Sequence, residues 1–107
     1  VNLGIGGSDL GPQLACSALA GFHARSLNIH FVSSLDRNAI DDRLAQLNPA
    51  TTLFVVSSKS FGTEETLVNA QIAMGWLKAA GIQAAAHMVA VTASPKRAIA
   101  TGIQPSH

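Results

Sequence analysis

Charged residues are scarce in this 107-residue chain, where Asp, Glu, Lys and Arg make up only 12%, against roughly 25% in an ordinary soluble domain. The length suits one domain with a core of its own. Because such a domain standing alone needs a well-solvated surface, we expect other protein to cover much of it. The chain also begins at Val1, inside an apolar run and without an initiator methionine. We therefore expect residues 1–107 to be a piece of a longer polypeptide.

Cysteine and aromatic residues are equally few. The single cysteine, Cys16, excludes an internal disulfide and fits a reducing compartment. The four histidines show no metal-ligand spacing, so we expect neither a metal nor a cofactor. Seven basic residues are scattered along a chain of net charge +1 that has no tyrosine. The sequence therefore argues against nucleic-acid binding.

Long apolar runs are absent as well. The sequence contains no stretch of about 18 apolar residues, and its first residues lack the basic flank and cleavage site of a signal peptide. We expect a cytoplasmic protein with no membrane partner.

Four short runs of β-branched or aliphatic residues are the main structural signal. Their residues are apolar at consecutive positions, which is typical of strands buried on both faces of a parallel sheet. The predicted strands are 1–5, 28–33, 52–57 and 87–92.

The segments between these runs have helical periodicity with start and stop signals. The first helix is predicted from about Gly11 to Ala20, with Pro12 in its first turn, and the third from about Glu64 to Ala80, with Thr63 as its N-cap. The third helix should turn one face inward. That face comprises Leu67, Ala70, Met74 and Leu77. The other two helices are predicted at about 38–47 and from Ser94-Pro95 to Gly102.

The resulting βαβαβαβα order predicts one doubly wound α/β unit. Right-handed crossovers leave few arrangements of four parallel strands. We favour the flavodoxin-like order 2-1-3-4, because the two segments with ligand-type residues follow strands one and three. In that order the two strands are neighbours, and the crevice between them is where ligands bind.

The first of these segments is the glycine-rich stretch from Gly4 to Pro12. Glycines let a backbone approach a ligand, and the helix N-terminus that follows favours an anion. A tight turn that binds nothing is one alternative. A dinucleotide fingerprint is another, but Asp9 stands at its third glycine and would repel a pyrophosphate. Asp36 could serve as its ribose-binding acid, or simply as a turn or cap residue.

The second segment, from Ser57 to Thr63, combines hydroxyls with Lys59 and a glycine where a helix begins. Hydroxyls donate to phosphate oxygens and the ammonium supplies charge, so the pattern indicates a phosphate-monoester site. It is not a P-loop, because no glycine precedes the lysine at the required spacing. An ordinary Ser/Thr-rich turn with Thr63 as the cap remains the alternative.

Other candidate residues have structural interpretations. Glu64 and Glu65 point about 100° apart on a helix and suit its N-terminal dipole better than a shared proton. We expect His87 to pack in the core or at a sheet edge, and Trp76 and Phe22 to be packing residues.

Together the two segments resemble the phosphoglucose isomerase family. The motifs that carry the resemblance are GIGGSDLGP at 4–12, FVSSLD at 31–36 and LNPATTLFVVSSKSFGTEET at 47–66, followed by LVNA. Similarity extends through nearly the whole chain. It implies a partial sugar-isomerase (SIS) domain over residues 1–107, and an enzyme that interconverts glucose 6-phosphate and fructose 6-phosphate in glycolysis and gluconeogenesis.

The resemblance also implies roles for individual residues. Hydroxyls of the second motif would hold the sugar phosphate, and the Gly-Ser of the first would line the same pocket. The implied phosphate ligands are Ser58, Lys59, Ser60 and Thr63, and the implied pocket residues are Gly7 and Ser8. The sequence departs from the family pattern at Ser60 and Gly62, where threonines are common. Ser60 keeps a hydroxyl, so phosphate binding should survive.

The family's catalytic residues have no match here. Proton transfer through a cis-enediol would need a glutamate base and an arginine, both expected beyond His107, and a homodimer is implied for the full-length protein. The isolated piece should therefore be inactive and depend on the rest of its polypeptide. A sugar-phosphate-sensing module without catalysis is the second hypothesis, and a dinucleotide-binding domain is the third.

Overall fold

The computed structural model describes residues 1–22, 26–34 and 36–104. The predicted strands and helices all occur, in the predicted order. The elements are β1 (Asn2–Leu3), α1 (Gly7–Ala18), β2 (Phe31–Val32), α2 (Arg37–Ala45), the 3-10 turn η1 (Pro49–Thr51), β3 (Phe54–Ser57), α3 (Glu64–Ala79), the 3-10 turn η2 (Ala84–Ala86), β4 (Met88–Val91) and α4 (Pro95–Ala100).

The strands form one parallel sheet in the order β2-β1-β3-β4, which confirms the predicted flavodoxin-like topology. In the β1–β3 pair, Asn2 lies opposite Val55 and Leu3 opposite Val56. All four strands are shorter than predicted. β1 is the clearest case, because it ends at Leu3, where the glycine-rich segment begins.

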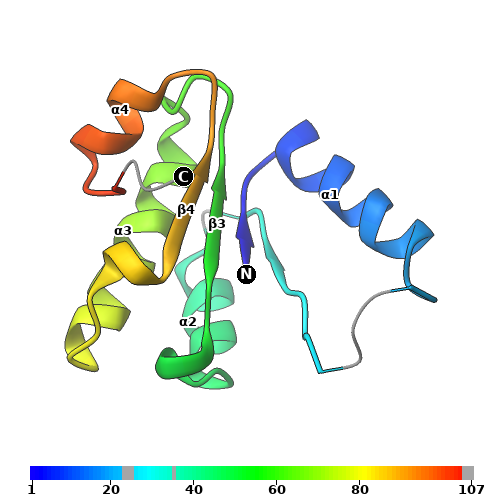
Figure 1. Ribbon diagram of the computed structural model, residues 1–107, viewed down its shortest axis with the longest axis horizontal. Coiled ribbons are helices and arrows are strands. Elements are labelled where there is room, and N and C mark those ends of the chain that lie inside the picture. Colours follow the sequence, from blue (N-terminus) through cyan, green and yellow to red (C-terminus); the bar gives the residue numbers. More distant parts are fainter. Residues whose placement is uncertain (23–25, 35, 105–107) are drawn as a thin grey trace.

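The direction of each crossover decides which face a helix covers. The chain moves from β1 to β2 in one direction and from β2 to β3 in the other, so right-handed crossovers place α1 and α2 on opposite faces. In Figure 1, α1 lies alone on one side of the sheet, while α2, α3 and α4 lie on the other. The sheet therefore has one face with three helices and one face with a single helix.

The hydrophobic core lies on the three-helix face. Alternate residues of a strand point to opposite faces, so Leu3, Phe54 and Val56 share this side and are fully buried. They pack with Ile40 of α2 and with Leu77 of α3. Trp76 meets Phe54 edge to face at a centroid distance of 5.9 Å, which confirms its predicted packing role.

The inward face of α3 differs from the predicted one. Ala70 and Leu77 are buried as predicted, but Leu67 and Met74 lie half-buried at the edge of the core. The remaining buried positions of α3 are Thr66, Asn69 and Ala73. Apolar periodicity could not identify a face that includes two polar side chains. Asn69 is accommodated because its Nδ2 donates to the carbonyl of Ser34 at 2.9 Å.

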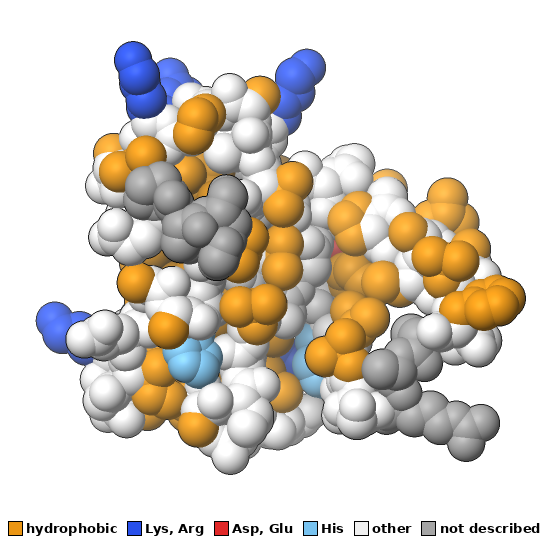
Figure 2. Space-filling view, viewed as in Figure 1, with side chains coloured by type: hydrophobic (Ala, Val, Ile, Leu, Met, Phe, Trp, Pro, Cys, Tyr) orange, Lys and Arg blue, Asp and Glu red, His pale blue; other side chains and the backbone are white. Residues whose placement is uncertain are grey.

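The outer face of α1 is apolar. Leu10 and Leu14 are exposed, and Phe22 is 87% exposed, so the prediction that Phe22 packs in this unit was wrong. Figure 2 shows hydrophobic side chains gathered over the α1 side of the molecule. This surface agrees with the expectation, drawn from the low charge, that other protein covers part of the chain.

Among the described residues, no helix combines the length and apolarity needed to cross a bilayer.

Replacing Phe54 by Ala tests the core. Phe54 is fully buried between β-strands and α3, so we expect Phe54→Ala to lower the free energy of unfolding by about 3–5 kcal/mol. The neighbouring side chain of Leu53 is 49% exposed, and Leu53→Ala should cost less than about 1 kcal/mol. Urea denaturation followed by circular dichroism compares the two variants. Equal losses would contradict this assignment of the core.

Candidate functional site

The two predicted ligand segments meet at one edge of the sheet. β1 and β3 are parallel neighbours, so the chain leaves both strands at the same edge. A Cβ atom at Gly4 would lie 2.7 Å from the carbonyl oxygen of Ser8 and 3.1 Å from that of Ser57. The first turn of α1 and the end of β3 therefore pack against the same glycine, as the predicted crevice requires.

The first segment enters its helix earlier than predicted. α1 begins at Gly7 rather than at about Gly11, so Gly7 and Ser8 lie in the first helical turn. Gly6 stands at the N-cap with φ of 55°, a left-handed conformation that favours glycine. The helix therefore begins at the carboxyl edge of the sheet, where the positive end of its dipole favours an anion.

Pro12 lies inside α1 and not in its first turn as predicted. A proline there has no N–H, so the carbonyl of Ser8 loses its helical partner. The side-chain Nδ2 of Asn2 donates to that carbonyl at 3.0 Å instead. The early helix start is thus compatible with the proline because a side chain from β1 supplies the missing donor.

The second segment places its hydroxyls around the start of α3. Ser58 is buried, and its Oγ lies 3.4 Å from Oγ1 of Thr63. Thr63 occupies the N-cap position as predicted, but its side chain makes no capping hydrogen bond. Between them, Phe61 is buried with φ of 49°, an unusual conformation for a residue other than glycine. The buried ring anchors the loop, while Lys59 and Ser60 are exposed.

The segment after β4 holds this loop in place. The carbonyl of Lys59 accepts hydrogen bonds from Oγ1 of Thr92 at 3.0 Å and from the amide of Ala93 at 2.9 Å. Nη1 of Arg97 donates to the carbonyl of Ser60 at 3.3 Å. Sequence reasoning did not assign a role to Thr92 or Arg97. The available signal was their place in the chain, because Thr92 ends the predicted strand and Arg97 lies in the helix predicted after it, and residues that follow parallel strands collect at the carboxyl edge.

Positive charge is concentrated at this end of the molecule. Lys59 follows β3, while Lys96 and Arg97 lie in α4, and all three side chains are exposed. Figure 2 shows Lys and Arg side chains projecting at the end where β3 and β4 finish. These cations and the N-terminus of α3 favour an anion at this edge, while the carboxylates of Glu64 and Glu65 in the first turn of α3 act against it.

The acidic candidates have structural positions. Asp9 is buried, with Oδ2 accepting from Nε2 of Gln13 at 2.8 Å. Asp36 is the N-cap of α2, and its Oδ1 accepts from the amide of Asn38. Glu64 and Glu65 lie in the first turn of α3, where the helix dipole favours them.

His87 has a partner that the sequence did not reveal. Its Nδ1 lies 2.8 Å from the carbonyl of Thr52, at the opposite edge of the sheet from the two loops. His87 is half-buried directly before β4, which agrees with the predicted packing in the core or at a sheet edge. Within the described ranges, no three His, Cys, Asp or Glu side chains are grouped as a metal site.

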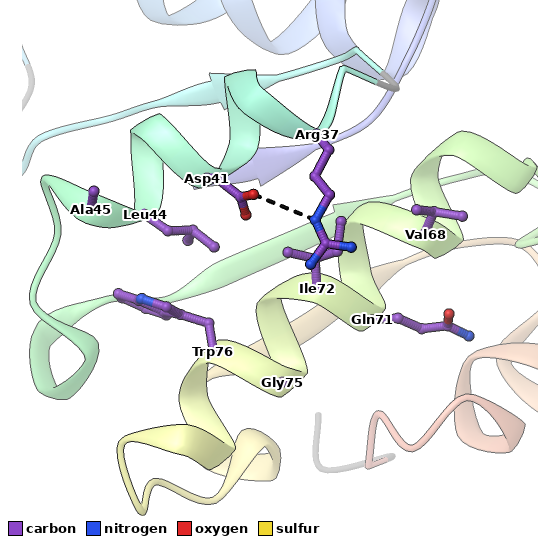
Figure 3. A pocket seen from close by; sticks show the side chains of 9 residues that line it. All are labelled: Arg37, Asp41, Leu44, Ala45, Val68, Gln71, Ile72, Gly75 and Trp76. Atoms are coloured by element: carbon purple, nitrogen blue, oxygen red, sulfur yellow. Dashed lines mark ion pairs between the residues drawn. The ribbon is translucent and has the colours of Figure 1, made fainter.

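A groove of about 720 Å³ between α2 and α3 lies away from these loops. Figure 3 shows Trp76, Leu44 and Ile72 on its walls and the ion pair of Arg37 with Asp41 at its rim. The Arg37 Nε to Asp41 Oδ2 distance is 3.4 Å, and both side chains are largely exposed. None of the predicted ligand residues lines this groove.

Comparisons with known proteins identify the family of the chain. A family model described as phosphoglucose isomerase matches residues 1–107. Glucose-6-phosphate isomerase 2 of Chromobacterium violaceum is 55% identical over the whole chain, which spans 20% of that protein. The Aromatoleum aromaticum glucose-6-phosphate isomerase is 52% identical over 96% of the chain, again 20% of the relative.

Two solved structures share the fold of the chain. A glucose-6-phosphate isomerase from Chlamydia trachomatis superposes with a TM-score of 0.80 at 36% identity, over 85% of this chain and 18% of that one. The hypothetical protein TT0462 from Thermus thermophilus superposes with a TM-score of 0.79 at 34% identity, over 96% and 26%.

The fold and the hydroxyl-rich edge define a class, a doubly wound α/β domain with ligand-type loops after its first and third strands. Within that class, the chain belongs to the phosphoglucose isomerase family. It spans about one fifth of the length of the curated relatives that it matches.

Two glycine substitutions test the geometry of the site. In Gly4→Ala the new Cβ would meet the Ser8 carbonyl at 2.7 Å, so we expect a loss of about 1–3 kcal/mol in the free energy of unfolding. In Gly62→Ala the nearest atom is Nη1 of Arg97 at 2.9 Å, a flexible side-chain end that can move. That variant should stay within about 1 kcal/mol of the parent. Thermal and urea unfolding measure both, and the reverse order of stabilities would refute the packing described.

Proposed function

We propose that this chain is part of a glucose-6-phosphate isomerase and that its carboxyl edge binds the phosphate of the sugar substrate. Ser58, Lys59, Ser60 and Thr63 would contact the phosphate, with Gly7 and Ser8 lining the same pocket. The observation that carries the proposal is the meeting of the two segments at Gly4, because it brings a hydroxyl-rich loop and two helix N-termini to one edge.

The chemistry of the edge supports a phosphate dianion as ligand. Hydroxyls and backbone amides donate short hydrogen bonds to phosphate oxygens, and the ammonium of Lys59 adds a point charge. Thr63 leaves its hydroxyl uncommitted to capping α3, within 3.4 Å of the Ser58 hydroxyl. Two adjacent hydroxyls at a helix N-terminus can both donate to one phosphate group.

The proton-transfer step would be performed by residues outside this chain. Isomerisation between C1 and C2 needs a base near the substrate and a group that stabilises the developing oxyanion. Among the acidic side chains of the two segments, Asp9 is buried and accepts from Gln13 through Oδ2, and Glu64 and Glu65 lie in the first turn of α3. This piece would supply binding energy through the phosphate, and the rest of a cytoplasmic, homodimeric enzyme would supply the chemistry.

Two alternatives make different predictions. A non-catalytic sugar-phosphate sensor would use the same edge but would be followed by a regulatory segment instead of catalytic residues. A dinucleotide-binding domain would use an acid for the ribose, whereas Asp36 caps α2 through Oδ1. Titration with NAD against a sugar phosphate distinguishes the dinucleotide hypothesis from the other two.

Removing two hydroxyls should weaken substrate binding. In the full-length enzyme, we expect Ser60→Ala combined with Thr63→Val to raise the KM for fructose 6-phosphate, because each hydrogen bond to a charged group contributes about 1.5–3 kcal/mol. Ser17→Ala combined with Thr51→Val removes hydroxyls at exposed positions away from the two loops and serves as the control. Steady-state kinetics gives both values. An unchanged KM in the Ser60/Thr63 variant would refute the assignment.

The 107-residue chain alone should not turn over substrate. We expect no isomerase activity from purified chain in a coupled dehydrogenase assay, because the base and the oxyanion-stabilising group would be missing. The matched control is the full-length enzyme at the same molar concentration. Activity that co-purifies with the chain above background would contradict this division of roles.

A further inference from the structure

Asn2 links the two segments of the site through its side chain. Its Nδ2 donates to the carbonyl of Ser8 at 3.0 Å, and its Oδ1 accepts from the Oγ of Ser57 at 2.9 Å. Ser8 lies in the first turn of α1, and Ser57 is the last residue of β3, directly before Ser58. One amide therefore contacts both sides of the crevice.

The two hydrogen bonds of the Asn2 amide are buried, and their polar atoms have few other partners. Asn2 and Ser57 are each only 8% exposed, so water competes weakly for their polar atoms. Pro12 cannot donate to the Ser8 carbonyl, which leaves Asn2 as its donor. Within the sheet, Asn2 pairs with Val55, and Ser57 is therefore its diagonal neighbour on the same face.

Gly4 shows independently that the same two backbones are held close together. A Cβ there would contact the carbonyls of Ser8 and Ser57, at 2.7 and 3.1 Å. The glycine permits the approach, and the Asn2 amide connects its two sides. Loss of the amide would leave the Ser8 carbonyl without a donor and the Ser57 hydroxyl without an acceptor.

We propose that Asn2 is a positioning residue that sets the distance between the first turn of α1 and the loop from Ser57 to Thr63. It does not touch the substrate; it acts through Ser8 on one side and through Ser57 on the other. This inference rests on the proposed function, since it assigns Asn2 to the same phosphate site. Phosphate affinity should therefore depend on Asn2 although Asn2 is not a ligand.

The test measures the Kd for inorganic phosphate by titration calorimetry in the full-length protein, at a temperature where every variant is folded. Asn2→Leu removes both hydrogen bonds at similar volume, and Ser57→Ala removes one. We expect each to raise the phosphate Kd by roughly threefold to tenfold. Both substitutions break the hydrogen bond between Asn2 and Ser57. The double variant should therefore bind phosphate no more weakly than Asn2→Leu alone.

Thr52→Val is the matched control. Thr52 is also 8% exposed and its Oγ1 donates to the carbonyl of Asn48 at 2.7 Å, at the opposite end of β3. It should lose stability as Ser57→Ala does, but its phosphate Kd should stay within about twofold of the parent. A purely structural role for Asn2 predicts the same phosphate Kd in all folded variants. If Asn2→Leu does not fold, Ser57→Ala against Thr52→Val decides the question.

The outcomes separate this inference from the proposed function. If the parent binds phosphate and Ser60→Ala with Thr63→Val weakens it, while Asn2→Leu and Ser57→Ala bind like the parent, the positioning role is refuted and the proposed function stands. If the parent does not bind phosphate at all, both fail. Weakened binding in the Asn2 and Ser57 variants, with normal binding in Thr52→Val, supports the positioning role.

Discussion

The parallel pairing of β1 with β3 is the constraint on which the site depends. It brings together segments that are about fifty residues apart and directs both chain exits to one edge of the sheet. The pairing follows from topology: the chain first crosses to β2 and then returns past β1 to β3, which creates a switch point between them. The glycine at position 4 and the amide of Asn2 then bring the two exits into contact.

The two faces of the sheet serve different purposes. The face covered by α2, α3 and α4 contains the aliphatic core and accounts for most of the burial. On the α1 face, Asn2 and Ser57 form a polar contact, and α1 directs leucines outward. This arrangement suits a domain that forms one layer of a larger protein, in which the exposed apolar side of α1 would be covered.

The loop from Ser57 to Thr63 is fixed by its backbone, while Lys59 and Ser60 keep their side chains exposed. The carbonyls of Lys59 and Ser60 are bound by the segment after β4, and the ring of Phe61 is buried beneath them. A binding loop held this way loses little conformational freedom when a ligand arrives, because its backbone is already ordered. The hydroxyls and the ammonium can then serve recognition.

The order of elements, the strand order, the two loops and the family could all be predicted from the sequence, because consecutive apolar runs, glycines and the SSKSFGTEET motif are local signals. The early start of α1, the inward face of α3 and the exposure of Phe22 could not. The first two depend on contacts with residues distant in the chain, and the exposure of Phe22 follows from how α1 lies on the sheet. Pro12 predicts a helix start by local rules and is accommodated inside α1 because Asn2 supplies a donor across space. Local patterns determined the elements and the two segments with ligand-type residues. Tertiary packing determined which of these residues face each other, because hydrogen bonds between strands and helices form only once the sheet has assembled.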